Sequence, residues 1–256
     1  MYIPIYIFII ERFFIMADKR FAILIDAENI SDKYIKVILD EVSNDGIITY
    51  KRIYGDWTKA AMSSWKNVLL SYSITPIQQY NYTTGKSSTD SAMIIDAMDI
   101  LYSGNVDGFC IVSSDSDFTR LAVRLRESGM YVVGMGETKT PSPFVAACNR
   151  FKFLEIIGNV KKNISSNYQE NNELNIKTVK NTVAEIIADI SDENGWASLS
   201  EVGNILVKRF PSFDVRHFGQ KKLTLFIESL NIFELKAMQK GNDPNVKVMY
   251  VKMKKR

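Results

Sequence analysis

Short apolar segments that alternate with helical segments constrain the fold of residues 21–157 more than any other feature. Residues 21–26 run through Ala-Ile-Leu-Ile and end in Asp26, which is typical of a strand buried in a parallel sheet. Apolar residues then recur at helical spacing before the next apolar run begins. This alternation predicts an α/β domain with a mostly parallel central sheet. The predicted strands are 21–26, 47–54, 74–80, 108–113, 130–134 and 152–157, and the predicted helices are 35–42, 59–72, 90–101, 118–127 and 143–149.

A change of composition marks a second domain. Residues 159–175 contain six asparagines and few apolar residues, which is the composition of a linker. Helical segments follow at 179–190, 198–209 and 221–229, and two strands follow at 232–238 and 246–253 with a turn at 241–244. Three helices and a hairpin predict a small winged helix-turn-helix. The predicted domains are therefore 19–158 and 176–256.

The first 18 residues form an apolar extension. Residues 1–10 are too short to span a bilayer, which takes about 20 residues, and they lack the basic start and cleavage site of a signal peptide. Met16 precedes the first strand closely, so we interpret Met16 as the physiological start. The alternative is an interfacial anchor. We expect a cytoplasmic protein with no membrane contact unless the extension is native.

The rare residues exclude several kinds of site. The chain has one histidine, His217, and two cysteines, Cys110 and Cys148. A Ser-His-Asp triad would have to use His217, and a Cys/His zinc site would need all three residues and a carboxylate. Acid-base and metal chemistry in this chain therefore rests on carboxylates, which favour hard cations such as Mg²⁺ or Mn²⁺.

Four aspartates fall where ligands bind in parallel sheets, at the carboxyl ends of the strands. Asp26 ends the first strand, Asp115 and Asp117 follow the strand that ends at residue 113, and Asp90 begins a helix. Such carboxylates can hold divalent ions that neutralise the charge of a phosphodiester under attack. Asp90 and Asp117 also have a simpler interpretation as helix caps, whereas an unpaired Asp26 would be costly to bury.

These residues resemble the NYN domain, a branch of the PIN-like ribonuclease superfamily. The matching segments are Ile-Asp-Ala-Glu-Asn-Ile at 25–30, Lys-Ser-Ser-Thr-Asp at 86–90, Val-Ser-Ser-Asp-Ser-Asp-Phe at 112–118 and Ala-Cys-Asn-Arg-Phe at 147–151. The resemblance covers residues 21–157, and it implies a PIN-like three-layer fold and a Mg²⁺- or Mn²⁺-dependent endoribonuclease.

The same resemblance implies a role for each matching residue. Asp26, Asp90, Asp115 and Asp117 would be the catalytic metal ligands, and Asn29 and Asp96 would be supporting polar residues. Asp96 lies six residues after Asp90, about 240° further around a helix, so the two side chains would not both face one site. Asn149 stands where the closing motif of the family commonly has an acid.

The second region resembles the OST-HTH (LOTUS) domain, a family linked to RNA binding. The resemblance lies in Gly-Trp-Ala-Ser-Leu at 195–199, Phe-Pro-Ser-Phe-Asp at 210–214 and Phe-Gly at 218–219. The surplus of positive charge agrees with an RNA partner: from residue 170 onward there are 14 Lys and Arg against 11 Asp and Glu, which accounts for the whole net charge of +3. The predicted RNA contacts are Arg216, Lys221, Lys222, Lys252, Lys254 and Lys255.

Two functions therefore remain open at this point. The first is a metal-dependent endoribonuclease with an RNA-binding module, acting on single-stranded or structured RNA. The alternative is a non-catalytic RNA-binding or scaffold protein, which Asn149 favours. The sequence also leaves a homodimer open.

Overall fold

The computed structural model describes residues 19–80, 88–158, 175–239 and 247–254. The apolar extension, nearly all of the predicted linker, the predicted turn at 241–244 and Lys255 lie outside these ranges. Within them, no helix has both the length and the apolar character that crossing a membrane requires.

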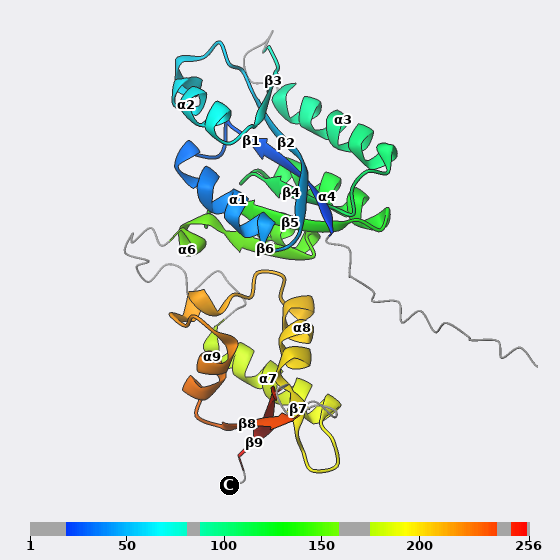
Figure 1. The fold of residues 1–256 in the computed structure, drawn as a ribbon, viewed down its shortest axis with the longest axis vertical. Helices are drawn as coiled ribbons and strands as arrows, with labels where there is room; N and C mark the ends of the chain where they lie inside the picture. The colour runs from blue at the N-terminus through cyan, green and yellow to red at the C-terminus, as the bar shows by residue number, and fades with distance from the viewer. Residues whose placement is uncertain (1–18, 81–87, 159–174, 240–246, 255–256) are drawn as a thin grey trace, which may run out of the picture.

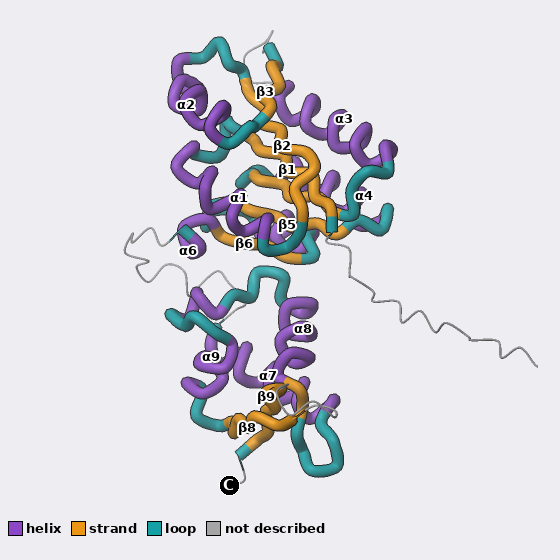
Figure 2. Tube along the Cα trace, viewed as in Figure 1, coloured by secondary structure: helices purple, strands orange, loops and turns teal. Residues whose placement is uncertain are grey.

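A six-stranded parallel sheet forms the centre of the first domain (Figures 1 and 2). Its spatial order is β3-β2-β1-β4-β5-β6, and each of its five pairings is parallel, which confirms the predicted sheet. The order reverses between β1 and β4, so ligands are expected at the carboxyl ends of these two strands. The strands are β1 (Arg20–Asp26), β2 (Ile47–Gly55), β3 (Thr75–Gln78), β4 (Gly108–Val112), β5 (Tyr131–Gly136) and β6 (Arg150–Phe153).

Helices cover both faces of this sheet and make a three-layer domain. Side chains of β1 alternate between the two cores: Ile23 packs with one set of helices and Leu24 with the other, and both are fully buried. Burying a side chain of this size contributes about 1.5–3 kcal/mol. The first core is completed by α1 (Ile35–Ser43), α2 (Ser63–Ser71) and α6 (Leu154–Ile157), and the second by α3 (Ser88–Ser103), α4 (Thr119–Glu127) and α5 (Ser142–Ala147).

The end of the first domain differs from the sequence prediction. Residues 152–157 were predicted as one strand, but the strand is β6 and the chain then turns into the short helix α6. Leu154 is fully buried in the core between α1 and the sheet. An apolar run of this length fits a strand or a buried helix equally well, and packing against α1 decides in favour of the helix.

The second domain is helical with a small antiparallel sheet. Its core includes Val183, Leu206 and Phe226, one from each helix, together with Val251 of the sheet. The sheet has the order β7-β9-β8, and the sequence prediction lacked its two-residue strand β7. The elements are α7 (Ile176–Ile190), β7 (Ala197–Ser198), α8 (Leu199–Arg209), the short 3₁₀ helix η4 (Val215–Phe218), α9 (Leu223–Ser229), β8 (Phe233–Gln239) and β9 (Lys247–Met253).

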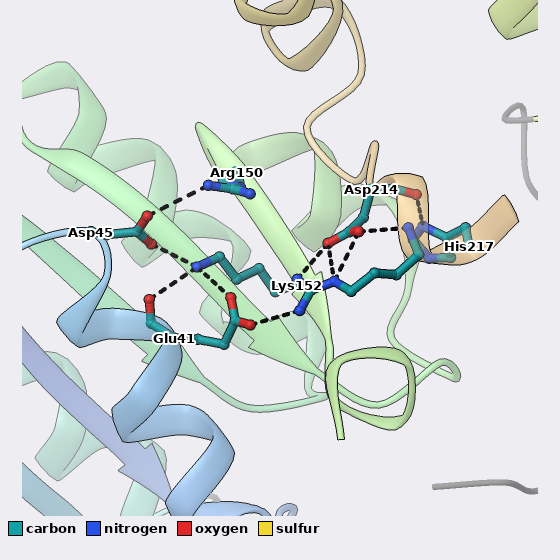
Figure 3. A network of polar contacts seen from close by, with 7 residues as sticks. Glu41, Asp45, Arg150, Lys152, Asp214 and His217 are labelled. Carbon is teal, nitrogen blue, oxygen red and sulfur yellow. Dashed lines mark hydrogen bonds and ion pairs between the residues drawn. The ribbon is translucent and has the colours of Figure 1, made fainter. Parts of the chain in front are cut away.

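An ion-pair network joins the two domains at β6 (Figure 3). Lys152 of β6 is buried, and its ammonium group pairs with Glu41 near the end of α1 at 3.0 Å and with Asp45 just after α1 at 2.7 Å. Arg216 of η4 reaches the same Glu41 at 2.7 Å and holds Asp214 of its own domain at 2.6 Å. Glu41 is thus shared by a cation from each domain.

Two further contacts join the two domains beside this network. The outer edge of β6 donates the Phe151 N–H to the carbonyl oxygen of Pro211, 2.9 Å away in the second domain. The imidazole of His217 packs edge-on against Phe153, with 5.8 Å between the ring centroids. Burial lowers the pKa of His217, against the opposing charge of Asp214. His217 therefore serves packing between domains.

Candidate active site

Asp26 closes β1 at the point where the strand order reverses. Its side chain is only 1 % exposed, and each of its two oxygens accepts two hydrogen bonds. Oδ1 accepts the backbone N–H groups of Glu28 and Asn29 at 3.0 and 3.2 Å. Oδ2 accepts the Asn29 amide and the Ser113 hydroxyl, both at 2.7 Å. A carboxylate has about four acceptor positions, so the acceptor capacity of Asp26 is used up by the protein itself.

The ionisation of Asp26 reflects these surroundings. Burial raises the pKa of Asp26, because the charged form loses its hydration, and the hydrogen bonds from Ser113, Asn29 and Glu28 lower it in part. Asn29, predicted as a supporting residue, lies beside Asp26 and holds one of its oxygens.

The other three predicted aspartates come together in one group. Asp90, Asp115 and Asp117 each offer a carboxylate oxygen, and these oxygens all lie within 4.8 Å of one another. Asp90 comes from the first turn of α3, whereas Asp115 and Asp117 come from the segment after β4. We call these residues the three-acid group. Asp115 also accepts the Asp117 N–H at 2.9 Å, so it caps the turn that presents its neighbour.

Ser113 connects Asp26 to the three-acid group. Its hydroxyl donates to Asp26 and accepts the backbone N–H of Asp115 at 3.0 Å, and the residue is fully buried. The next residue, Ser114, accepts the Glu137 N–H at 2.8 Å and ties this segment to the end of β5. Sequence reasoning missed both serines as parts of the site. The sequence feature that could have indicated them is a pair of consecutive serines directly after an apolar strand.

The donor chemistry of the group fits a hard divalent ion. The three-acid group offers only carboxylate oxygens, which Mg²⁺ and Mn²⁺ prefer. Carboxylates this close together repel one another unless a cation or protons neutralise them. Thr89, next to Asp90, is 2 % exposed, and its hydroxyl is a buried side-chain oxygen without a hydrogen-bond partner within the described ranges.

Asp96 lies outside this group, although the resemblance implied a supporting role for it. Its carboxylate accepts hydrogen bonds from the Arg52 guanidinium and the Tyr54 hydroxyl, which both come from β2. Burial first and then the neighbouring Asp96 raise the pKa of the fully buried Tyr54. Asp96 therefore fastens α3, the helix that carries Asp90, to the sheet.

Asn149 lies at the opposite end of the sheet from the three-acid group. Its side-chain oxygen accepts the Val132 N–H at 2.8 Å, near the start of β5, and it precedes the first residue of β6. In the three-acid group, Asp115 and Asp117 follow the carboxyl end of β4 instead. The feature that favoured a non-catalytic protein is therefore remote from these carboxylates.

The predicted RNA contacts of the second domain have different surroundings. Arg216 is committed to Glu41 and Asp214 at the domain joint, whereas Lys221 and Lys222 are exposed and form no ion pair within the described ranges. Lys254 is exposed and donates to the Asn231 carbonyl oxygen at 3.3 Å. Lys252 donates to the Asn194 carbonyl oxygen and lies near the ring of Trp196.

Family models identify the two domains of this chain. No curated protein matches the chain. One similar solved structure is the crystal structure of a Vibrio parahaemolyticus protein of unknown function, at 16 % sequence identity and a TM-score of 0.44; the match covers 53 % of this chain and 92 % of that one. The family model of the OST-HTH/LOTUS domain matches residues 175–244. The family model of the NYN domain matches residues 20–155, just over half of the chain, and the protein therefore belongs to the NYN domain family, with an OST-HTH/LOTUS domain after it.

Proposed function

We propose that the protein is a metal-dependent endoribonuclease whose second domain, a winged helix, helps to bind the RNA. The observation that carries this proposal is the convergence of Asp90, Asp115 and Asp117 within 4.8 Å at the switch point of the sheet. Membership of the NYN family and the OST-HTH/LOTUS match support an enzyme that acts on RNA. Asn149, the feature that favoured a non-catalytic protein, has a structural role elsewhere.

The three-acid group would hold Mg²⁺ or Mn²⁺. Such an ion lowers the pKa of water and neutralises charge on the phosphate as it is attacked. We propose a different role for Asp26 from the one that the resemblance implied. Because its acceptor positions are filled, Asp26 orients the turn at residues 113–117 through Ser113 instead of binding the ion directly.

The test is cleavage of a labelled single-stranded RNA by the full chain with Mn²⁺ or Mg²⁺. We expect Asp90→Asn and Asp115→Asn to lower the cleavage rate at least about a hundredfold, because a catalytic ion supplies several kcal/mol. Asp99→Asn is the matched control, because Asp99 is an exposed acid on the same helix as Asp90. Wild-type protein that cleaves no faster than both variants would contradict the proposal.

Ion binding can also be measured without cleavage. Mn²⁺ should raise the melting temperature of the wild type, because a ligand that binds the folded state stabilises it. We expect Asp115→Asn to lose this shift and Asp26→Asn to keep most of it. Loss of the shift in Asp26→Asn, with the fold intact by circular dichroism, would show that Asp26 binds the ion directly.

A further inference from the structure

Trp196 of the second domain lies beside two lysines. It is partly exposed in the turn before β7, and its ring centroid is 6.0 Å from Lys236 Nζ and 5.6 Å from Lys252 Nζ. These distances lie within the range of cation–π contacts. Figure 1 shows β8 and β9, which carry the lysines, at the end of the second domain that faces away from the first.

The register of the small sheet adds a second aromatic ring to this surface. Tyr250 of β9 pairs with Ser198 on one side and Lys236 on the other. Side chains alternate along a strand, and Val251 points into the core, so Tyr250 and Lys252 both point to the outer face. We call Trp196, Lys236, Tyr250 and Lys252 the aromatic face.

A hollow of about 670 Å³ adjoins the two rings. Trp196 and Tyr250 line it together with the polar side chains of Ser198, Ser200 and Asn204. Hydrogen-bonding capacity remains available there, because within the described ranges neither the Trp196 indole N–H nor the Tyr250 hydroxyl has a partner. A planar ligand with hydrogen-bonding edges could stack on these rings and use these groups.

Acidic and basic side chains occupy different parts of the surroundings of the aromatic face. Asp192 and Glu201 line the hollow, and Asp192 accepts the backbone N–H groups of Asn194 at 2.9 Å and Trp196 at 2.8 Å, so it shapes the turn. These acids repel phosphate from the hollow, whereas Lys236 and Lys252 attract it to the outer face. The ligand therefore places its aromatic part in the hollow and its anionic part over the lysines.

We propose that the aromatic face binds single-stranded RNA, with unstacked bases against Trp196 and Tyr250 and phosphates over Lys236 and Lys252. Double-stranded RNA does not offer its bases for such stacking, whereas single strands do. This inference rests on the proposed function only in taking RNA as the substrate. It places RNA on the sheet side of the domain, away from Lys221 and Lys222 before α9.

The test measures RNA affinity of the full chain by fluorescence anisotropy, in EDTA so that cleavage does not occur. The probe is a labelled single-stranded RNA of mixed sequence, about 20 nucleotides long, and its duplex form serves for comparison. We expect Trp196→Ala to weaken binding about tenfold, in line with the loss of one stacked base, and Trp196→Phe to stay within about threefold of the wild type. Tyr250→Leu gives an independent second test of stacking.

The lysines are tested by the salt dependence of binding. The double variant Lys236→Gln, Lys252→Gln should reduce the slope of log affinity against log salt by about 1.4, since each neutralised phosphate of a single strand contributes about 0.7. Tyr102→Ala and Lys177→Gln are matched controls, because both residues are exposed and lie on α3 and α7, away from the aromatic face. Circular dichroism checks that each variant is folded.

The outcomes separate this inference from the proposed function. If folded Trp196→Ala and Tyr250→Leu bind the single strand as tightly as the wild type, the inference is overturned, and Lys221→Gln, Lys222→Gln then tests the helix side. Equal affinity of the wild type for single strand and duplex, or no binding at all, also overturns it. Cleavage with Mn²⁺ is scored separately, so binding that depends on Trp196 without any cleavage would refute the nuclease alone.

Discussion

Arg216 of the second domain donates a hydrogen bond to Glu41 of the first across 2.7 Å, and the same Glu41 carboxylate also pairs with the buried Lys152. Burial of Glu41 opposes its ionisation, but the hydrogen bonds and charges of Arg216 and Lys152 outweigh this effect and lower its pKa. Removing the negative charge of Glu41 would leave the buried Lys152 ammonium with fewer acidic partners. A buried charge that loses its partner lowers the stability of the folded protein.

Glu41→Gln should therefore destabilise the protein. We expect the free energy of unfolding to fall by about 2 kcal/mol, because Lys152 keeps only Asp45 as an acidic partner and Arg216 keeps only Asp214. Urea denaturation followed by circular dichroism measures the change. Glu193→Gln, an exposed acid without an ion pair in the described ranges, is the control. Equal midpoints for the two variants would refute the role of Glu41.

The contact between the two domains should become less stable in mild acid because of His217. The unfolded histidine takes up a proton near pH 6.5, whereas burial lowers its pKa in the folded protein. Protonation therefore favours unfolding, so stability falls as the pH drops through about 6.5 and levels off below the folded pKa. Glu41 and Asp214 stay ionised in this interval, because their pKa values are lowered.

His217→Phe should remove this part of the pH dependence. Phenylalanine keeps a ring against Phe153 but takes up no proton. Urea midpoints at about pH 7.5 and about pH 5.5 give the comparison. We expect the midpoint of the wild type to drop more than that of the variant, and identical drops would assign the effect to other groups.

Ser113→Ala should impair catalysis more than it impairs the fold. The hydroxyl links Asp26 to the Asp115 backbone, and loss of such a supporting contact typically costs about 10–100-fold in metal affinity or activity. We expect the Mn²⁺ concentration for half-maximal cleavage to rise by this factor. Ser64→Ala, on the exposed side of α2, should match the wild type. An unchanged Mn²⁺ requirement in folded Ser113→Ala would remove Ser113 from the site.

Asp96→Asn should weaken the attachment of α3 to β2 and destabilise the protein. The substitution removes the charge that pairs with Arg52 and weakens the acceptor of the buried Tyr54 hydroxyl, so we expect a loss of about 1–3 kcal/mol. Thermal unfolding checks this, and Tyr54→Phe, which deletes only the hydroxyl, should give a smaller loss. A melting temperature like that of the wild type for both variants would contradict the proposed link between α3 and β2.

The sequence predicted the layers of the first domain and grouped four aspartates at one edge of the sheet, because strand ends in a parallel sheet share one edge. Three of them, Asp90, Asp115 and Asp117, converge in the structure. Asp115 and Asp117 follow the end of β4, and the first turn of α3 brings Asp90 beside them. The sequence did not predict the role of Ser113. Its hydroxyl donates to Asp26, 87 residues earlier in the chain, and only the fold brings the two side chains together. The sequence also did not pair Asp96 with Arg52, since that contact depends on how α3 is rotated against β2.

In the second domain, the partners of Arg216 could not be predicted from the sequence either. From sequence it is a basic residue near a predicted turn, in a domain with surplus positive charge. In the structure it pairs with Asp214 and also with Glu41, which lies 175 residues earlier in the chain. Local composition indicates an affinity for phosphate, but only the docking of η4 on α1 and β6 shows that the guanidinium already has an anion.

The hydrogen bond from Phe151 to Pro211 has a consequence for how the two domains depend on each other. β6 is the last strand of the sheet, and an uncovered last strand is a template for pairing with another molecule. Through this hydrogen bond the second domain covers part of that edge, which leaves less of it open to pairing with another chain. A first domain cut free at the linker would expose this backbone edge and tend to aggregate through it.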